Sequence, residues 1–394
     1  MDTLNLKRLP DYKTLAGNQL PIDRTVRNGF QICIQNTTRE ECMAYAKQLE
    51  LCGFEQYAVN EICENMFYTY TSDNTSVFLS WNAFLKTARI VVHASDNLPS
   101  RDRTVLNESD TCIPCLAQIR VMDGLSYVIQ FVDESFLVVD GGYYHDADLQ
   151  NLYQFLVEKS VNGRKPIISA WMFTHSHDDH IALATEFIRE KAGEVEIKAF
   201  LYQFPNCTQM NTREDDAQMQ QDIEQLEKNI IDYYPDAATY TLHTGQTYYF
   251  KGLEIEILFT AEDIYPYQAA HYNDVSAAWR IKFDNGKTFL MLGDCFSYSC
   301  KQLADTYGDY LKSDILQLTH HGLLGGDKRL YQYVDPEVCL WTTQKDRFLG
   351  ERQTDKFRYC LGEGGCDYNA WIRDESVRVR KHYHAGVTTV LNMD

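Results

Sequence analysis

One short segment, Thr174–Ile181, places three histidines and two aspartates within six consecutive positions. It directly follows the apolar run 166–173, whose length and composition are typical of a buried strand. Neutral imidazole and carboxylate groups together form open sites for Zn²⁺, Mn²⁺ or Fe, and a surface loop seldom collects so many ligand types by chance. The sequence therefore predicts a metal site on the loop that leaves a strand of an α/β sheet.

Three further loops carry ligand-type residues where predicted strands end. Asp140 and Asp294 each follow an apolar run, and His320 and His321 follow a third. An aspartate after a strand is by itself most often a turn or capping residue. Loops at the strand ends of a layered α/β scaffold are, however, where binding groups converge. Their occurrence together with the histidine-rich segment favours one shared site.

The order of these motifs resembles that of the metallo-β-lactamase superfamily over about residues 116–394. The motifs are His-x-His-x-Asp-His after a strand, an Asp-Gly before it, a later Gly-Asp and a final His-Gly. Segments 273–276, 286–294 and 319–322 resemble one branch in particular. That branch includes the hydrolase domain of bacterial DNA-uptake competence channels and a choline-phosphate esterase.

The resemblance implies an α/β fold, a four-layer αββα metallo-β-lactamase sandwich, with a binuclear metal site at one edge of its sheets. It also implies phosphoester hydrolysis more often than lactam cleavage. We expect this hydrolase domain to span residues 111–394, preceded by a small α+β accessory domain and linker over residues 1–110.

The residue types suggest how two cations would be shared. His175 and His177 lie two apart on an extended loop and can hold one ion, while Asp179 and His180 can hold a second. Asp294 is suited to bridge the two ions, because one carboxylate has two oxygens to share. Zn²⁺ is the expected metal, and the carboxylates also admit Mn²⁺ or Fe.

The adjacent residues His320 and His321 are expected to have different roles. One of them completes the second metal site, and we favour His321. The other then faces the substrate as a donor to a developing negative oxygen or as the acid for the leaving group. Asp140 is expected to orient a ligand imidazole or the reacting water through a hydrogen bond. Asp179, His320 and Asp140 are therefore the predicted catalytic residues.

The chain departs from the general superfamily pattern at one position. Most members supply a further histidine shortly before the Gly-Asp strand to complete the first metal site. Here His271 is displaced by about a residue from that place, and Asn273 is the alternative, as in the narrower branch. His271 is therefore a predicted ligand with Asn273 as its competitor.

Three function classes fit these residues to different degrees. The favoured one is a metal-dependent hydrolase of a small phosphoester or phosphodiester, in which activated water replaces a serine or cysteine nucleophile. The same chemistry would cleave a lactone, lactam or thioester. A non-catalytic metal-binding scaffold is a further alternative. A flavin-linked redox role is disfavoured, because the chain has no glycine-rich phosphate loop or additional domain for the cofactor.

Composition limits the partners. The formal net charge of −19 repels nucleic acid and anionic membranes, which favours a small, anionic substrate bound at a locally positive metal centre. No apolar run approaches the ~20 residues that span a bilayer, and residues 1–8 lack the apolar core of a secretory signal. We therefore expect a cytoplasmic protein whose 12 cysteines, including the Cys112 and Cys115 pair, are reduced. The sequence does not indicate an oligomeric state.

The accessory region shows a helix signal of its own. Thr38 and Glu41 form a predicted capping box before a helix that reaches Leu51, and three strands are expected between residues 66 and 93. Elsewhere, His382 and His384 are expected either to flank the cleft or to form a polar edge before a strand at 387–391. Three other histidines are expected at the surface or at helix caps: His93, His145 and His243.

Overall fold

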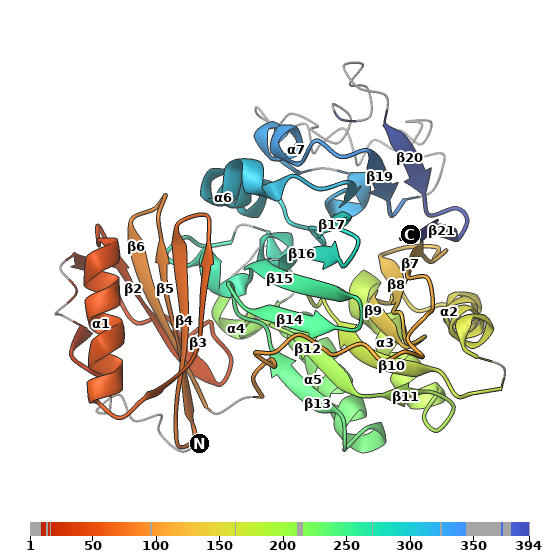
Figure 1. Ribbon diagram of the computed structural model, residues 1–394, viewed down its shortest axis with the longest axis horizontal. Helices are drawn as coiled ribbons and strands as arrows, with labels where there is room; N and C mark the ends of the chain where they lie inside the picture. The colour runs from red at the N-terminus through yellow and green to blue at the C-terminus, as the bar shows by residue number, and fades with distance from the viewer. Residues whose placement is uncertain are drawn as a thin grey trace.

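The computed structural model describes residues 9–12, 15, 17–94, 97–161, 163–210, 216–269, 271–323, 325–343, 372 and 380–393. Within these ranges the chain forms three sheets, one in an N-terminal unit and two in a larger body (Figure 1). No helix of the described residues is long and apolar enough to cross a bilayer.

The first sheet of the body has eight strands in the order β13-β12-β10-β9-β8-β7-β21, with the short β11 beside β10. Strands β9, β10, β12 and β13 run parallel, and the remaining pairs along that order are antiparallel. Its strands are β7 (Cys115–Gln118), β8 (Ser126–Gln130), β9 (Phe136–Asp140), β10 (Ile167–Met172), β11 (Glu196–Ile197), β12 (Ala199–Tyr202), β13 (Ala238–Thr241) and β21 (Thr389–Asn392).

The second sheet has seven strands in sequence order, antiparallel from β14 to β17 and parallel from β17 to β20. Its strands are β14 (Thr247–Phe250), β15 (Leu253–Phe259), β16 (Ala278–Phe283), β17 (Thr288–Met291), β18 (Ile315–Gln317), β19 (Val338–Trp341) and β20 (Lys381–His384).

Side-chain alternation explains how these two sheets stack. In β9, Leu137 and Val139 join the apolar core shared by both sheets, whereas Phe136 and Val138 join the core under the helices. Successive side chains of a strand point to opposite faces, so an entirely apolar strand can bury both. Helices cover the two outer faces, which gives the predicted four-layer αββα order and confirms the expected fold class. The helices are α2 (Asp146–Lys159), α3 (Asp178–Glu190), α4 (Cys207–Met210), α5 (Asp216–Tyr233), α6 (Ser297–Tyr307) and α7 (Lys328–Val334).

Short 3-10 helices follow several strands of the body, and two of them carry predicted site residues. They are η3 (Ala261–Ile264), η4 (Tyr272–Val275), η5 (Gly308–Leu311) and η6 (His320–Gly322).

The N-terminal unit is an antiparallel sheet in the order β1-β2-β6-β5-β4-β3, with α1 on its outer face (Figure 1). Thr38 and Glu41 cap α1 reciprocally, so the predicted capping box is confirmed. Its elements are β1 (Asn18–Gln19), β2 (Gly29–Gln35), α1 (Arg39–Leu51), β3 (Glu55–Ile62), β4 (Asn65–Ser72), β5 (Thr75–Asn82) and β6 (Thr87–Ala94).

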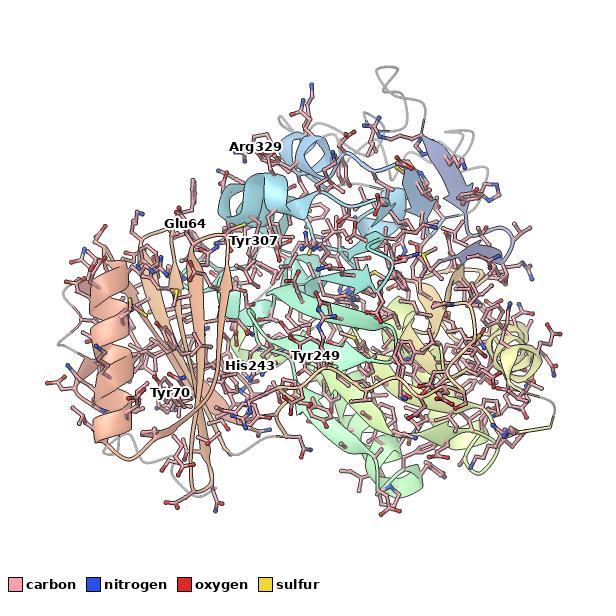
Figure 2. All side chains as sticks on the ribbon, in the orientation of Figure 1. Glu64, Tyr70, His243, Tyr249, Tyr307 and Arg329 are labelled. Carbon is pink, nitrogen blue, oxygen red and sulfur yellow. The ribbon has the colours of Figure 1, made fainter. Side chains whose placement is uncertain are left out.

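The other face of this N-terminal sheet packs against the body. Phe78 stacks on His243 with ring centroids 3.5 Å apart, and His93 meets the same imidazole edge-on at 5.0 Å. Figure 2 shows His243 between the N-terminal sheet and the second sheet of the body. His93 and His243 are both buried, so the prediction of a surface or capping role was wrong for them. Their burial depends on the docking of two units that lie far apart in sequence.

Several local predictions also need correction. β3 was not expected, because its residues are largely polar and half exposed. The segment after the histidine run predicts a helix that begins at Ile181, whereas α3 begins at Asp178 and ends at Glu190, so two predicted ligands lie in its first turn. His382 and His384 lie on β20 at the edge of the second sheet, which confirms the alternative of a polar edge, and the strand that follows them begins at Thr389 rather than at residue 387. The acidic, helix-periodic segment 211–234 also predicts a helix, and α5 occupies its described part, because residues 211–215 lie outside the described residues.

Candidate metal centre

Parallel strands bring the predicted ligand loops to common sheet edges. β9 and β10 are parallel neighbours, so Asp140 at the end of β9 lies beside the loop that leaves β10. β17 and β18 are likewise parallel, and their exits carry Asp294 and the pair His320 and His321. Because the carboxyl ends of parallel strands meet at one edge, residues that are far apart in sequence reach one place.

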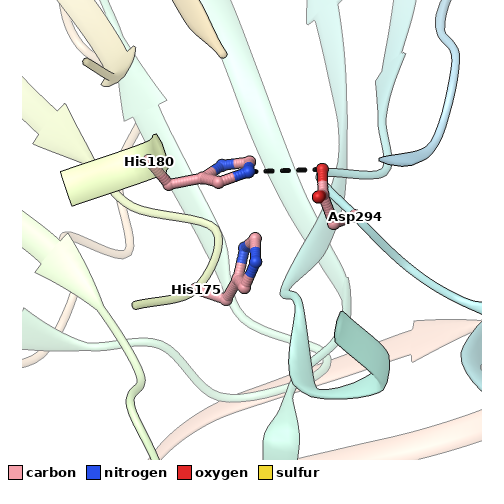
Figure 3. Close-up of side chains that lie close together, drawn as sticks. All are labelled: His175, His180 and Asp294. Carbon is pink, nitrogen blue, oxygen red and sulfur yellow. Dashed lines mark ion pairs between the residues drawn. The ribbon is translucent and has the colours of Figure 1, made fainter. Parts of the chain in front are cut away.

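A first group of ligand atoms comes from His175, His180 and Asp294. One ligand atom from each lies within 4.8 Å of the others, and all three residues are buried (Figure 3). Burial, reinforced by His180 and His177 nearby, holds the pKa of His175 well below its usual value. His175 therefore presents a neutral imidazole, which is the form that binds a cation.

A second group comes from Asp179, His180 and His321. Nε2 of His321 lies 3.1 Å from Oδ2 of Asp179 and 3.1 Å from Oδ2 of Asp294. The other oxygen of Asp294, Oδ1, lies 3.4 Å from Nε2 of His180. Each oxygen of Asp294 thus faces a different histidine, and this carboxylate lies between the two groups.

Several central atoms of the two groups lack ordinary partners. Nε2 of His180, Nε2 of His321 and Oδ1 of Asp294 are buried and form ion-pair contacts at 3.1–3.4 Å, but none makes a hydrogen bond of ordinary geometry among the described residues. A buried polar atom without a partner costs ~1–3 kcal/mol. Coordination to divalent cations would satisfy all three atoms, and the mixed imidazole and carboxylate donors suit such ions. The residues present therefore fit a metal centre.

The outer nitrogens of two histidines are held by protein groups. Nδ1 of His180 lies 2.7 Å from Oδ2 of Asp140, and Nδ1 of His321 lies 3.0 Å from Oγ1 of Thr342. Asp140 is itself fixed, because it accepts from the backbone N–H of Thr174 at 2.8 Å and from its hydroxyl at 2.6 Å. Such contacts orient a ligand imidazole so that its other nitrogen faces the metal. Sequence reasoning anticipated Asp140 but missed Thr174 and Thr342.

Charges within the two groups compensate one another. Burial alone would lower the pKa of His321, yet the carboxylates of Asp294 and Asp179 outweigh it and raise that pKa to about 9. The pKa of His180 is likewise raised well above its usual value against the effect of burial. Burial opposes ionisation of Asp294, but His321 and His180 keep its pKa well below the usual range. Bound cations would replace the protons of these imidazoles.

The backbone is strained at three of the site residues. Asp140, His320 and His321 have φ values of 51°, 49° and 57°, in the left-handed region that non-glycine residues seldom adopt. Such conformations cost ~1–3 kcal/mol each and persist where surrounding structure enforces them, often at functional sites. The His-His-Gly turn thereby aims two adjacent imidazoles in different directions.

Close approach of backbone segments also depends on glycine. A Cβ atom on Gly124 would lie 1.8 Å from the carbonyl oxygen of Asp179, so only glycine fits beside the first turn of α3. Leu125 donates its N–H to the same carbonyl at 3.2 Å. The β7–β8 connection therefore supports the helix end that carries Asp179 and His180.

The remaining predicted ligands lie around these groups. Nδ1 of His177 is 2.9 Å from Nε2 of His175, which is close enough for both rings to bind one cation. His271 instead stacks on Phe296 with ring centroids 4.9 Å apart and joins neither group of ligand atoms. Asn273 is buried, and its Oδ1 has no hydrogen-bond partner among the described residues.

His320 lies apart from the two ligand groups. Its ring is 5.5 Å from Phe296, 6.3 Å from His271 and 6.0 Å from His321, and the side chain is half-buried. Phe296, His271 and His320 thus form a group of neighbouring rings beside His321, which we call the imidazole rim. Sequence reasoning did not identify Phe296 as part of this rim.

Two further sequence features lie outside the site. The indole N–H of Trp341 donates to Nδ1 of His382 at 3.0 Å, which gives His382 a structural partner. Cys112 and Cys115 are not joined in a disulfide, and burial raises the pKa of both thiols above the usual value. A raised pKa disfavours the reactive thiolate, so this pair has the character of inert thiols.

The fold is similar to that of several solved structures. The metallo-β-lactamase fold protein YhfI from Bacillus subtilis is 18% identical, with a TM-score of 0.40, over 71% of this chain and 100% of that chain. Human tRNase Z, short form, is 10% identical, with a TM-score of 0.38, over 71% of this chain and 99% of that chain.

CmlA, a diiron β-hydroxylase from Streptomyces venezuelae, is 11% identical with a TM-score of 0.39. The match covers 71% of this chain and 54% of CmlA, so the chain spans about half of that protein's length. Neither a protein-family model nor a curated protein sequence matches the chain. Likeness at these identities concerns the fold alone, so activity has to be inferred from the residues of the site.

Proposed function

We propose that this protein is a metal-dependent hydrolase with a binuclear centre. The observation that carries the proposal is the convergence of two ligand groups on Asp294, whose two oxygens face different buried histidines. We assign His175 and His177 as imidazole ligands on one side of Asp294, with His180, which belongs to both groups, between the two sides. Asp179 and His321 complete the other side. Zn²⁺ is the expected ion, with Mn²⁺ or Fe as alternatives.

Two divalent cations bound there would supply a nucleophile from water at neutral pH and neutralise negative charge that develops on the substrate. The chain's own residues orient and polarise this centre. Asp140 fixes the ring of His180 through Nδ1, and Thr342 fixes the ring of His321. We assign His320, on the imidazole rim, as the donor of a proton to a developing negative oxygen or to the leaving group.

The favoured substrate is a small, anionic phosphoester or phosphodiester. Its support is the resemblance of segments 273–276, 286–294 and 319–322 to the phosphoesterase branch, together with the half-buried histidines of the rim. The net charge of −19 opposes approach of a long polyanion, so a small molecule is favoured over nucleic acid.

Metal analysis and a substrate panel test this proposal. Purified protein should contain up to two equivalents of metal. With added Zn²⁺ or Mn²⁺ it should hydrolyse bis(p-nitrophenyl) phosphate faster than a lactone or a lactam. Turnover of a carbonyl substrate without phosphodiester turnover would reverse the ranking of substrates. Iron together with a flavin spectrum would favour redox chemistry, and protein that takes up no metal would contradict the proposed function.

A further inference from the structure

A buried tyrosine hydroxyl contacts the loop that carries the first two histidines. Oη of Tyr272 lies 2.7 Å from Oγ of Ser176 and 3.4 Å from Sγ of Cys207. Tyr272 is 0% exposed and belongs to η4, about a hundred residues after Ser176 in sequence. The contact is therefore a tertiary link between the metal loop and another part of the body.

Ser176 lies between His175 and His177 in the sequence, so a contact that fixes Ser176 also restricts the backbone of both histidines. The ring of Tyr272 also packs against both imidazoles, with centroids 5.2 Å from His177 and 6.3 Å from His175. Residues 173–177 connect β10 to α3 without regular secondary structure. Side-chain contacts are therefore important for fixing the direction of these two rings.

The other partner of the hydroxyl lies in a well-anchored segment. Cys207 begins α4, and the N–H of its neighbour Asn206 donates to the carbonyl of Thr25 in the N-terminal unit at 2.7 Å. Arg27, two residues after Thr25 in the N-terminal unit, forms an ion pair with Glu227 of α5, in which Nη1 lies 2.7 Å from Oε1. The hydroxyl of Tyr272 thus links the metal loop to a part of the body that is held in place from two directions.

We propose that Tyr272 is a positioning residue for the metal centre, acting through Ser176 on His175 and His177. This inference rests on the proposed function, because it presupposes that the two histidines bind a cation. A phenylalanine at this position would keep the ring packing and lose only the hydroxyl contacts. The structure therefore separates the positioning role of the hydroxyl from the packing role of the ring.

The test compares Tyr272→Phe with Tyr307→Phe. The hydroxyl of Tyr307 donates to the carbonyl of Leu258 at 2.8 Å in another buried part of the core, so its removal deletes a comparable buried hydrogen bond. Zn²⁺ affinity of the metal-stripped full chain is measured by competition with a chromogenic chelator, and the Tm of the same metal-free samples is recorded.

Tyr272→Phe should weaken one of the two Zn²⁺ affinities, that of the ion held by His175 and His177, about tenfold, which is the lower end of the effect of outer contacts on metal sites. Tyr307→Phe should lower the Tm of the metal-free protein about as much as Tyr272→Phe does. It should, however, leave both Zn²⁺ affinities within about twofold of wild type. The inference is overturned if Tyr272→Phe binds Zn²⁺ like wild type. It is also overturned if Tyr307→Phe weakens binding equally, since the effect would then be one of general stability.

Ser176→Ala tests the same link from the other side. It should weaken Zn²⁺ binding by a similar factor. The double variant with Tyr272→Phe should bind Zn²⁺ no more weakly than either single variant, because both substitutions remove the same contact between Ser176 and Tyr272. Additive losses would contradict a shared link. Absence of Zn²⁺ uptake by wild type counts against the proposed function itself, whereas normal uptake by wild type and all variants counts only against the role of Tyr272.

Discussion

Two largely buried clusters of histidine and carboxylate side chains lie in this molecule, and their hydrogen bonding differs. The metal cluster lies at the sheet edges of the body. The interface cluster lies where the N-terminal sheet docks on that body, around His243 in Figure 2. The metal cluster comprises His175, Asp179, His180, Asp294 and His321. The interface cluster comprises Arg89, His93, His243, Glu262 and Asp263.

The carboxylates of the interface cluster are satisfied by the protein. Oε2 of Glu262 accepts from Nε2 of Gln203 at 2.9 Å and lies 2.9 Å from Nδ1 of His243, while Oε1 accepts from the N–H of Thr244 at 3.2 Å. Asp263 accepts from the N–H of Thr260 at 3.1 Å. These hydrogen bonds go to several different neighbours, and among the described residues no three ligand atoms of this cluster converge on one point.

The metal cluster has the opposite arrangement. Its outer atoms are bonded to Asp140 and Thr342, whereas Nε2 of His180 and Oδ1 of Asp294 converge without hydrogen bonds. In the part of the chain that the structure describes, three ligand atoms converge only in the two groups of this cluster. Burial of histidines and carboxylates therefore does not distinguish the two clusters, whereas the convergence of three ligand atoms does.

The largest expected difference between the clusters comes from removing one carboxylate in each. Asp294→Ala should reduce bound metal and lower turnover by at least ~100-fold, because a shared ligand matters more than the outer contacts whose loss costs 10–100-fold. The fold should persist, since the ligand loops lie at the sheet edge. Metal content by mass spectrometry, turnover and circular dichroism measure these three effects.

Glu262→Ala is the matched change in the interface cluster. It should leave the metal content unchanged and lower the free energy of unfolding by ~3–5 kcal/mol, because His243 loses its buried partner. Urea unfolding of the metal-free protein gives this value. Full turnover in Asp294→Ala would refute the bridging assignment, and loss of metal in Glu262→Ala would remove the distinction between the clusters.

Adjacent histidines provide a finer test within the metal cluster. His321→Ala should lower the bound metal by about one equivalent, since His321 belongs to a ligand group. His320→Ala should keep the metal content and lower kcat roughly 100-fold, because its ring lies on the imidazole rim and would donate to the reacting oxygen. If the two variants exchange these effects, the roles of His320 and His321 are exchanged as well.

Much of this arrangement is predictable from the sequence because its signals are local. An apolar run followed by Thr174–Ile181 indicates a strand exit with ligands, and the Gly-Asp and His-His-Gly turns indicate two more. Parallel pairing then brings the exits together. The position of Asp140 against His180 follows from the same rule, since β9 and β10 are parallel neighbours.

The remaining features depend on tertiary packing and leave little trace in the sequence. β3 is half exposed and largely polar, so its residues lack strand periodicity. Thr342 reaches His321 only because β18 and β19 are neighbours. The contact of His93 with His243 requires the N-terminal sheet to dock on a loop of the body that is distant in sequence. No local pattern marks such partners.

The smallest expected difference between the clusters is the sign of their pH dependence. Burial raises the pKa of Asp263 to about 6, with Arg89 opposing, whereas the pKa of Asp294 is lowered. In the unfolded chain an aspartate titrates near 4. The native state therefore holds a proton on Asp263 between about pH 4 and 6, so its contribution to stability is complete below pH 4 and is lost as the pH rises through 6.

Asp263→Asn isolates that contribution, because the amide is neutral at every pH and can still accept from Thr260. Its free energy of unfolding relative to wild type should rise by about 2 kcal/mol between pH 4.5 and 7. Asp294→Asn in metal-free protein should change in the opposite sense, and only below about pH 4, since a carboxyl with a lowered pKa stabilises the fold above its unfolded pKa and loses that effect as the pH falls further. Urea titrations at several pH values measure both slopes. Slopes of the same sign would mean that the two clusters do not differ in the way their carboxylates are stabilised.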